Sequence, residues 1–397
     1  MPFSITKNKA LTHVSELTSS YVHLSCAEYF AGIGLVRLGL EQAGWDVLFS
    51  NDWSLSKFEM YSAHFKDASK HYKVQDIFSI SSTDVPSTLL ATASFPCIDL
   101  SLAGNLKGID GKHSSAFWGF TQVLDSQVNK PKLVMLENVA GWLTSNQGED
   151  FRVTVQELNR LGYACDIVTI DAVRFVPQSR PRIFMIGVQM SDPNQDIFIF
   201  SQRSSSLKTS ALEKAVMSNL DLCWHFLDVP TLPDRMEFDL SFIVEDLPEN
   251  DQRWWSNDEV KRHLEMMSSV NLKYLKKLQD LSSYSYSSMY RRVRQGQQRA
   301  EIRKDGIAGC LRTARGGSSR QMLVRVGQSS IRMRLMTPRE YARLQGVPDS
   351  YPLPSQLNQA LTGFGDAVCV PVITWIAEGI LNPLAKSFQE SALTLQS

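Results

Sequence analysis

Paired cysteines and long apolar runs are both missing from this sequence. The six cysteines among its 397 residues are scattered singly along the chain. None belongs to a C-x-x-C pair, so their spacing predicts neither a metal site nor a disulfide framework. No stretch of about 18 consecutive residues is apolar, and the N-terminus lacks the apolar core of a signal peptide. We therefore expect a cytoplasmic protein without a membrane partner.

A net charge is missing as well, but the balance conceals a strongly basic segment. The chain holds 41 basic and 41 acidic residues. Residues 291–344 contain 13 arginines and one lysine against three acidic residues, a net charge of +11, so the rest of the chain carries −11. Such a segment favours a polyanionic partner, and the tyrosines and glycines among its arginines favour nucleic acid. A solvated basic surface is the alternative.

Strand-like and helix-like patterns alternate between about residues 22 and 190. This alternation is typical of a mostly parallel sheet with helices on both faces, so the sequence predicts an α/β fold. The predicted strands are 23–30, 45–52, 87–93, 132–139 and 182–188, and the predicted helices are 33–44, 55–65 and 148–162.

The alternation stops after residue 190. Two serine-rich stretches, 201–211 and 282–290, are typical of loops and predict a smaller, irregular domain. Helical patterning returns at 337–346, with Thr337 as the predicted N-cap and Pro338 at the first helical position, and again at 366–381. We expect an N-terminal tail (1–21), a main domain (22–194 and 332–385), the smaller domain (195–331) and a C-terminal tail (386–397).

A glycine-containing turn, YFAGIG at 29–34, follows the first predicted strand and opens a helix. Glycines at such a turn let the main chain approach a ligand closely. A dinucleotide-binding fingerprint needs a further glycine at position 37, where this chain has Arg37. A nicotinamide cofactor is therefore disfavoured, and an ordinary strand-to-helix turn remains an alternative.

Side chains suited to adenosine end the next two strands. Asp52 can accept both ribose hydroxyls. Trp53 can stack on adenine, although a tryptophan at a strand end is more often a core residue. A further strand, the third in chain order, ends at VQDIF (74–78), where Asp76 can accept from the adenine amino group. Because ligands of such sheets lie outside the carboxyl ends of the strands, these groups together predict a nucleoside site.

A cysteine stands just beyond the fourth strand, in the motif SFPCIDL. Pro96 makes the turn rigid, and a core cysteine would lie inside the apolar run rather than past its end, as Cys97 does. The fifth strand ends at Glu137, and the motif PQSRPR adds Arg180 and Arg182. A thiol, a carboxylate and two guanidiniums at one edge suit attack on an electron-poor ring, because neighbouring arginines increase the thiolate fraction.

Eight motifs carry a resemblance to a known family. FAGIG, NDW, DI, FPC, ENV, QSRPR, REYARLQG and GFGDAVCVPV occur in the order and spacing of the DNA cytosine-5 methyltransferases, which depend on S-adenosylmethionine. The chain resembles this family over roughly residues 22–190 and 332–382. The resemblance implies a Rossmann-like methyltransferase fold, a target recognition domain at 195–331, S-adenosylmethionine as cofactor and double-stranded DNA as partner.

The resemblance also implies a mechanism. Cys97 adds to C6 of a cytosine flipped out of the duplex, and Glu137 protonates or hydrogen-bonds N3. C5 then takes the methyl group, a base removes the C5 proton, and elimination frees Cys97. Arg182 holds the cytosine O2, and Arg180 fixes the active-site loop. The implied cofactor contacts are Phe30, Gly32, Ile33, Gly34, Asp52, Trp53, Asp76, Ile77, Asp366 and Ala367.

Several positions depart from the family pattern. Ile98 follows the cysteine where glutamine is usual, and Leu35 replaces a common glycine. Ser114 or His113 stands where an arginine is expected, so closure of the active-site loop uses other contacts. Asp366 replaces a usual asparagine, which bears on cofactor affinity.

The motif RTARGGSSRQ holds the expected DNA contacts, because its glycines allow close approach and arginine forks suit guanine in the major groove. These contacts are Arg312, Arg315 and Arg320. We expect a monomer, associated with the nucleoid in a bacterial host, and a cognate restriction endonuclease, where one exists, that acts separately.

Three other functions are weighed against this one. RNA cytosine-5 methyltransferases carry their nucleophile in the motif that here reads ENV, and the tRNA-acting branch carries Cys-Phe-Thr, which residues 310–321 lack. A catalytically dead homologue would only bind nucleic acid, but both Cys97 and Glu137 are present. A Rossmann dehydrogenase is disfavoured by Arg37.

Overall fold

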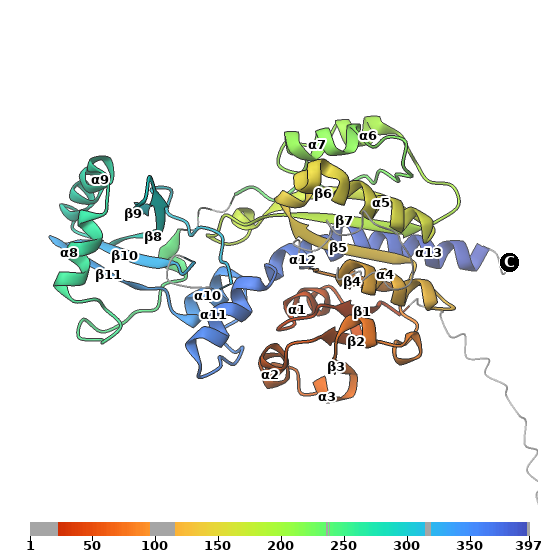
Figure 1. The fold of residues 1–397 in the computed structure, drawn as a ribbon, viewed down its shortest axis with the longest axis horizontal. Coiled ribbons are helices and arrows are strands. Elements are labelled where there is room, and N and C mark those ends of the chain that lie inside the picture. Colours follow the sequence, from red (N-terminus) through yellow and green to blue (C-terminus); the bar gives the residue numbers. More distant parts are fainter. Residues whose placement is uncertain (1–22, 96–115, 236, 238, 314–318, 395–397) are drawn as a thin grey trace, which may run out of the picture.

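Two lobes lie side by side along the long axis of the molecule (Figure 1). The computed structural model describes residues 23–95, 116–235, 237, 239–313 and 319–394. The larger lobe holds a seven-stranded sheet, and the smaller lobe holds a four-stranded sheet. Between the lobes lie α10 (Pro338–Leu344) and α11 (Leu357–Asp366).

The large sheet confirms the predicted α/β fold with a mostly parallel sheet. Its strand order is β3-β2-β1-β4-β5-β7-β6, and among these strands β7 alone runs against the others. The chain order reverses between β1 and β4, and ligands of such sheets bind at this switch point. The strands are β1 (Ser25–Tyr29), β2 (Asp46–Asp52), β3 (Tyr72–Val74), β4 (Leu90–Ala93), β5 (Leu133–Val139), β6 (Tyr163–Asp171) and β7 (Pro181–Gln189).

Helices cover both faces of the large sheet, each over its own apolar core. Successive strand residues alternate between the two cores, so that Cys26 faces one and Ala27 the other. Burial on both faces explains why the strands are continuous apolar runs in the sequence. One face carries α1 (Leu35–Gln42), α2 (Leu55–His64) and α12 (Val370–Ile376), and the other carries α4 (Ala116–Ser126) and α5 (Glu149–Arg160).

The smaller lobe is a regular antiparallel sheet, which corrects the expectation of an irregular domain. Its strand order is β11-β10-β8-β9. Most of the serine-rich stretch 282–290 is strand rather than loop, because Ser287 and Ser288 are buried and the Ser288 hydroxyl donates to the Ile307 carbonyl. The elements are β8 (Ser285–Arg294), β9 (Gln297–Ile302), β10 (Met322–Gly327), β11 (Ser330–Leu335), α8 (Asn257–Glu265) and α9 (Ser269–Gln279).

Residues 197–227 pack on the large sheet, although the sequence assigns them to the smaller domain. Their helices α6 (Ile197–Ser201) and α7 (Ser210–Met217) contribute to its second core. Trp224 forms a parallel bridge with Cys165 of β6. We propose that the boundary between the domains lies after this segment.

The C-terminal helices complete the core of the larger lobe. After α12 the helix continues through η7 (Ala377–Leu381) into α13 (Asn382–Thr394), well into the predicted C-terminal tail. One helical stretch, Leu357–Glu390, has the length and the mean hydropathy, 1.5, of a membrane span, but 67% of that apolar window is buried inside the protein. Packing against the sheet and α1 accounts for its apolar composition.

Short helices connect these elements, and α10 begins as predicted. Thr337 caps α10 in a capping box with Glu340, and Pro338 occupies the first helical position. The short helices are α3 (Ala68–His71), η1 (Ile77–Ser79), η2 (Ser82–Asp84), η4 (Ala140–Gly148), η5 (Ala172–Arg174) and η6 (Leu240–Phe242).

The contact between α1 and α12 depends on Gly39. A Cβ at this position would lie 2.6 Å from Cβ of Ile373 and 2.9 Å from the main-chain oxygen of Val370. We expect Gly39→Ala to lower the free energy of unfolding by about 1–3 kcal/mol, because the helices must move apart. Chemical denaturation measures this. The matched control is Gly141→Ala, whose Cβ would meet its nearest atom at 3.9 Å, and equal stabilities of the two variants would contradict the packing argument.

Candidate active site

The glycine turn after β1 presents open main chain at the switch point. Phe30, Gly32 and Gly34 have positive φ angles of 56°, 57° and 83°. A Cβ at Gly34 would lie 2.5 Å from the Phe65 ring, so only glycine fits there. A Cβ at Gly32 would meet its nearest atoms at 3.9 Å, which leaves room for a ligand. Ile33 is buried beneath the turn.

Asp52 holds this turn in place. Its Oδ2 accepts a hydrogen bond from the Gly32 main-chain nitrogen at 3.0 Å, and its Oδ1 accepts one from Ser54 at 2.9 Å. Each oxygen keeps a second lone pair, so the carboxylate can still accept ribose hydroxyls. The neighbouring Trp53 is 78% exposed and therefore is not a core tryptophan.

Asp76 and Ile77 follow β3, next to the end of β2. Asp76 is exposed, and its Oδ1 accepts from the main chain of Phe78 at 3.0 Å, which starts η1. Ile77 is buried against Gly119 of α4. The structure thus brings the predicted adenosine groups to adjacent strand ends, while their contact with adenosine stays a prediction.

Glu137 and Arg182 meet at the carboxyl end of β5. Antiparallel pairing with β7 sets Val139 opposite Arg182. As a result, Nε of Arg182 lies 3.0 Å from Oε1 of Glu137. Glu137 is 9% exposed. A carboxyl group and a guanidinium are therefore both held at this strand end, in the place where the sequence predicts them.

The segment that carries Cys97 begins beside this pair. Asn138, the neighbour of Glu137, donates from Nδ2 to the main-chain oxygen of Phe95 at 3.2 Å. Asn138 therefore ties the end of β4 to the end of β5, just before Pro96. The predicted nucleophile and the departures at positions 98, 113 and 114 lie outside the residues that the structure describes.

Arg180 joins three segments of the chain. The residue is 3% exposed, and its guanidinium donates to the main-chain oxygens of Leu311 at 2.9 Å, Ala367 at 2.6 Å and Gly365 at 3.2 Å. Its own main-chain nitrogen donates to Asp171 at 2.7 Å. Burial, and then the charge of Arg182, lower the pKa of Arg180. The predicted contact of Arg180 with the active-site loop involves residues beyond the described part of the chain.

Two buried glutamines, Gln178 and Gln345, add hydrogen bonds between the segments that Arg180 joins. The side chain of Gln178 accepts from the Leu311 main chain at 3.0 Å and donates to the Leu344 carbonyl at 2.7 Å. Gln345 donates to the carbonyls of Phe364 at 2.6 Å and Ala367 at 3.0 Å. Motifs that lie far apart in the sequence therefore meet through side chain to main-chain hydrogen bonds.

Cys310 is a residue of the site that the sequence analysis missed. Its Sγ lies 3.3 Å from Nη1 of Arg180 and 3.7 Å from Nη2 of Arg182. Because Arg182 also contacts Glu137, this thiol lies on the side of the site where the base is expected. A solitary cysteine has no spacing signal, so only the fold reveals its neighbours.

Glu28 is a second residue that the sequence analysis missed. It is 1% exposed in β1, and neither carboxylate oxygen has a hydrogen-bond partner among the described residues. Burial raises the pKa of Glu28 to about 8, although the positive charge of Arg37 acts to lower it. An acidic residue inside an apolar strand, as in SCAEYF, is the signal that marks it.

Asp366 lies near the glycine turn through its contact with Lys57, and the contact of Asp366 and Ala367 with the cofactor stays a prediction. Oδ2 of Asp366 lies 3.3 Å from Nζ of Lys57, and its Oδ1 accepts from the Thr313 hydroxyl at 2.6 Å. The stem of Lys57 lies next to Gly32. Lys57 escaped the sequence analysis because it belongs to an ordinary amphipathic helix, α2.

The predicted DNA-binding loop has its two ends on α11. Arg312 is exposed, and its main chain packs against Gly365. Arg320 donates to Oδ1 of Asn358 at 2.6 Å. Arg315 lies outside the described residues. Contact of these arginines with DNA stays a prediction.

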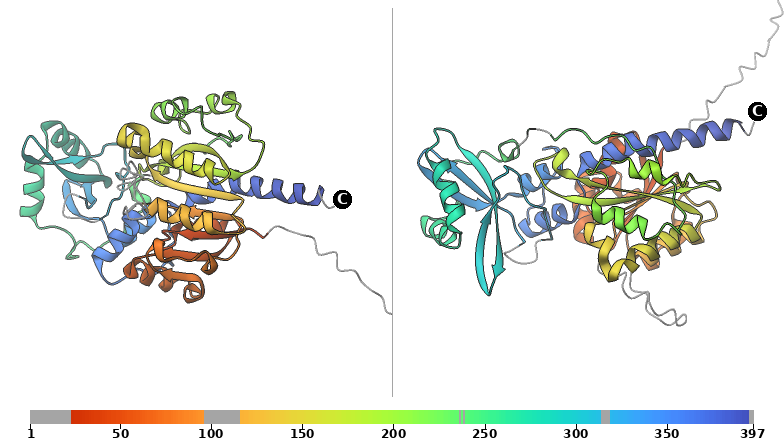
Figure 2. Two further views of the ribbon diagram at one scale, coloured as in Figure 1. Left: turned by 45° about the vertical axis from the view of Figure 1, so that its right-hand side comes forward. Right: turned by 90° about the horizontal axis from the view of Figure 1, so that it is seen from above.

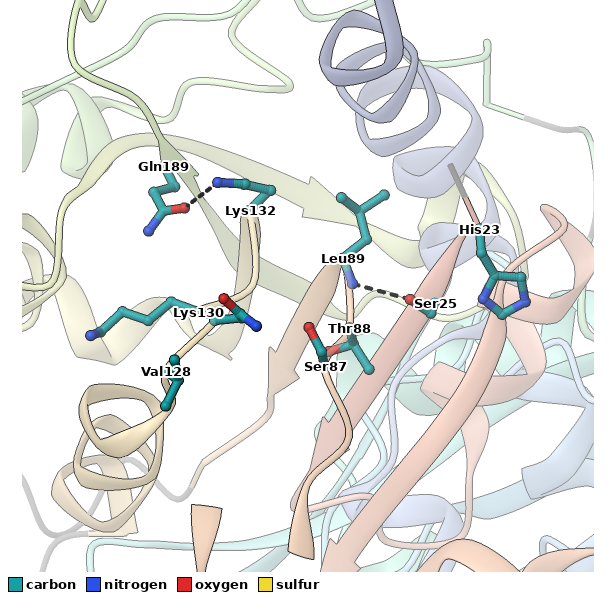
Figure 3. A pocket seen from close by; sticks show the side chains of 10 residues that line it. His23, Ser25, Ser87, Thr88, Leu89, Val128, Lys130, Lys132 and Gln189 are labelled. Carbon is teal, nitrogen blue, oxygen red and sulfur yellow. Dashed lines mark hydrogen bonds between the residues drawn. The ribbon is translucent and has the colours of Figure 1, made fainter. Parts of the chain in front are cut away.

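A cavity of about 510 Å³ lies at the opposite edge of the large sheet, where β1, β4 and β5 begin (Figure 3). On one side of it Nζ of Lys132 donates to Oε1 of Gln189 at 2.9 Å. Its position at the amino ends of the strands separates it from the predicted site. Its lining comprises His23, Ser25, Ser87, Thr88, Leu89, Val128, Asn129, Lys130, Lys132 and Gln189.

The residues at the switch point fit an adenosine cofactor. The open space at Gly32 lets a ligand approach the main chain. The spare lone pairs of Asp52 can accept ribose hydroxyls, and the exposed ring of Trp53 offers a stacking surface. Within the described ranges no cluster of three or more His, Cys, Asp or Glu side chains could hold a metal ion.

The raised pKa of Glu28 makes stability depend on pH. In the folded state the carboxyl keeps its proton up to about pH 8, whereas in the unfolded state it ionises near its ordinary pKa of about 4.3. Stability is therefore lost as pH rises between these values, by about 1.4 kcal/mol per pH unit. Glu28→Gln removes this loss, so its stability relative to the wild-type protein rises across the window.

Urea denaturation at several pH values measures this difference, with the exposed Glu378→Gln as control. Parallel pH profiles for the wild-type protein and Glu28→Gln would show that the carboxyl is ionised in the folded state.

Comparisons with known proteins identify the family of the chain. A family model described as C-5 cytosine-specific DNA methylase matches residues 24–382. The Type II methyltransferase M.HaeII of Haemophilus aegyptius is 28% identical over 358 residues, which cover 90% of this chain and 92% of that protein. The Type II methyltransferase M.HhaI of Haemophilus parahaemolyticus is 26% identical over 361 residues, which cover 90% and 94%.

Solved structures share the fold. Entamoeba histolytica methyltransferase EhMeth matches with a TM-score of 0.60 at 15% identity, and S. pombe Dnmt2 methyltransferase matches with a TM-score of 0.55 at 18% identity. Each match covers 91% of this chain and 99% of the other. Because the family model spans both lobes and every motif of the site, the chain belongs to the C-5 cytosine-specific DNA methylase family.

Proposed function

We propose that the protein transfers the methyl group of S-adenosylmethionine to C5 of a cytosine in duplex DNA, as a DNA (cytosine-5-)-methyltransferase. The observation that carries this function is the Glu137–Arg182 pair at 3.0 Å, held beside the start of the Cys97 segment by Asn138. Membership of the family supports DNA as the substrate.

The reacting groups then have defined tasks. The Cys97 thiolate forms a bond to C6, and Glu137 donates a proton or hydrogen bond at N3, which draws electrons from C6 and enriches C5. When bound, S-adenosylmethionine supplies an electrophilic methyl group that C5 attacks. A base removes the C5 proton, the C6–S bond breaks, and the thiolate and the aromatic ring are restored.

The surroundings of Glu137 support this role. The carboxyl is nearly buried, so water competes little for its hydrogen bond to the base. Arg182 contacts Glu137 through Nε and has further N–H groups for the cytosine O2. A cytosine reaches this position only outside the duplex stack, at a cost of a few kcal/mol.

The β8–β9 hairpin offers a DNA-binding surface beyond the predicted loop. β10 pairs only with residues 285–289 of β8, so residues 290–301 form a free two-stranded ribbon. The cyan hairpin in the right-hand view of Figure 2 extends away from the rest of the small sheet. The register sets Arg292 opposite Arg299 and Arg294 opposite Gln297, so these four side chains share one face of the ribbon.

This face suits the major groove. A two-stranded ribbon fits the groove, arginine pairs with guanine, and glutamine pairs with adenine. Glu301 contacts Arg292 at 3.1 Å and Arg294 at 3.0 Å. The face thus carries three guanidiniums, with Arg299, against one carboxylate, so its net charge is positive. We infer that the ribbon reads bases or phosphates together with Arg312, Arg315 and Arg320.

Several finer assignments belong to this proposal. The enzyme acts as a monomer in the cytoplasm and is associated with the nucleoid in a bacterial host. Any cognate restriction endonuclease acts separately. Methylation of tRNA is the alternative for the same fold, and binding of DNA without catalysis is another. Incubation with tritiated S-adenosylmethionine and either duplex DNA or tRNA separates them, because label in tRNA alone, or in neither, would exclude the proposed function.

Glu137→Gln should lower turnover by about two to four orders of magnitude, the range for a lost general acid. Cofactor affinity should stay unchanged, since Glu137 lies on the base side. Single-turnover methylation and calorimetry measure the two quantities. The exposed Glu149→Gln is the control.

The companion test uses a duplex with 5-fluorocytosine at the target position. The wild-type protein with cofactor should form a denaturation-resistant complex with this duplex, whereas Cys97→Ser should form none. Loss of cofactor affinity in Glu137→Gln, or a complex with Cys97→Ser, would refute these roles.

Alanine variants of Arg292, Arg294 and Arg299 test the ribbon. A lost base contact should cost about 1–3 kcal/mol and relax specificity at one position, whereas a lost phosphate contact should reduce the salt slope of binding by about one. Affinity across salt is measured on cognate and scrambled duplexes. Arg160→Ala, on α5 of the larger lobe, removes the same charge elsewhere. Three ribbon variants that behave like this control would remove the ribbon from the DNA interface.

A further inference from the structure

Lys57 and Asp366 form an ion pair beside the glycine turn. Nζ of Lys57 lies 3.3 Å from Oδ2 of Asp366, and the two side chains are 25% and 29% exposed. Lys57 belongs to α2 and Asp366 is the last residue of α11, so the pair joins segments far apart in the sequence. The Thr313 hydroxyl fixes the other carboxylate oxygen at 2.6 Å. Both oxygens of the Asp366 carboxylate are therefore held, one by Lys57 and one by Thr313.

The pair lies at one end of the proposed cofactor site. The Cδ atom of Lys57 is 3.9 Å from the position of a Cβ on Gly32, so its stem runs along the turn. Asp52, Trp53 and Asp76, the adenosine groups, lead from this turn towards the ends of β2 and β3. The remaining part of S-adenosylmethionine, its methionine end, is left to occupy the space over the glycine turn.

The charges of the pair complement that end of the cofactor. The methionine end carries an ammonium and a carboxylate on one carbon atom, whereas the adenosine end carries neither. Lys57 has three N–H donors and the Asp366 carboxylate has about four acceptor sites, of which Lys57 and Thr313 use two. Both side chains thus keep capacity for a second partner of opposite charge.

We propose that Lys57 and Asp366 together recognise the zwitterionic amino-acid end of the cofactor. Lys57 donates to its carboxylate and Asp366 accepts from its ammonium, so that four alternating charges lie side by side. An asparagine at 366 would leave Lys57 without its anion, whereas aspartate and lysine together form a neutral, two-sided receptor. This inference rests on the proposed function, because it deepens the recognition of the same cofactor.

Two nucleosides that differ only at this end provide the test. S-adenosylhomocysteine has the amino-acid group and 5′-methylthioadenosine lacks it. Calorimetry measures binding of both to the full-length wild-type protein, Lys57→Met and Asp366→Asn. We expect each variant to bind S-adenosylhomocysteine about tenfold to a hundredfold more weakly, the range for a hydrogen bond between charged groups. Binding of 5′-methylthioadenosine should change less than about twofold, and the double variant should lose little more than either single variant.

Lys66→Met, an exposed lysine beyond the end of α2, should leave both affinities unchanged. An unaltered melting temperature confirms that the variants fold. If Lys57→Met and Asp366→Asn weaken the binding of both nucleosides by the same factor, the pair only shapes the pocket and the inference is wrong. It is also wrong if the wild-type protein binds the two nucleosides equally well. A wild-type protein that binds neither contradicts the proposed function itself.

Discussion

The buried guanidinium of Arg180 holds the site together. Arg180 directly precedes β7, and its guanidinium donates to the 310–311 segment, to the end of α11 and to the link after it, so that it joins three segments that carry groups of the site. Burial of a guanidinium is costly unless its donors are paired, and the partners of Nη1 and Nη2 come from these segments, so the segments must be in place together. The site therefore requires the last motifs of the chain as well as the first.

The sequence predicts the parts of the site that lie at the ends of parallel strands. Asp52 and Glu137 lie at the ends of apolar runs and Asp76 follows the short strand β3, and parallel strands bring their carboxyl ends to one edge of the sheet. The strand order also brings β1 beside β4, but nothing local in the sequence states this. The resemblance of eight motifs replaced that missing information, because a family's motif order already contains its topology.

Other features could not be predicted because they depend on contacts distant in sequence. Serine-rich stretches are typical of loops, yet Ser287 and Ser288 are buried in β8, and the Ser288 hydroxyl donates to the Ile307 carbonyl. Residues 197–227 lack the alternation of the larger domain but fill one of its cores. Cys310 and Lys57 carry no motif, and their roles are visible only once Arg180, Arg182 and Asp366 are located around them.

The junction between the lobes uses mostly main-chain atoms of the smaller domain. Arg180 and Gln178 bind the carbonyl and amide of Leu311, groups that every residue type except proline provides in full. Substitution of the Leu311 side chain leaves both hydrogen bonds in place, whereas Leu232, Leu240 and Ile243 hold the junction through side chains that pack into the core of the larger lobe. Under the proposed function, the residues of the smaller lobe that face DNA can change while these main-chain contacts, and with them the chemistry, are preserved.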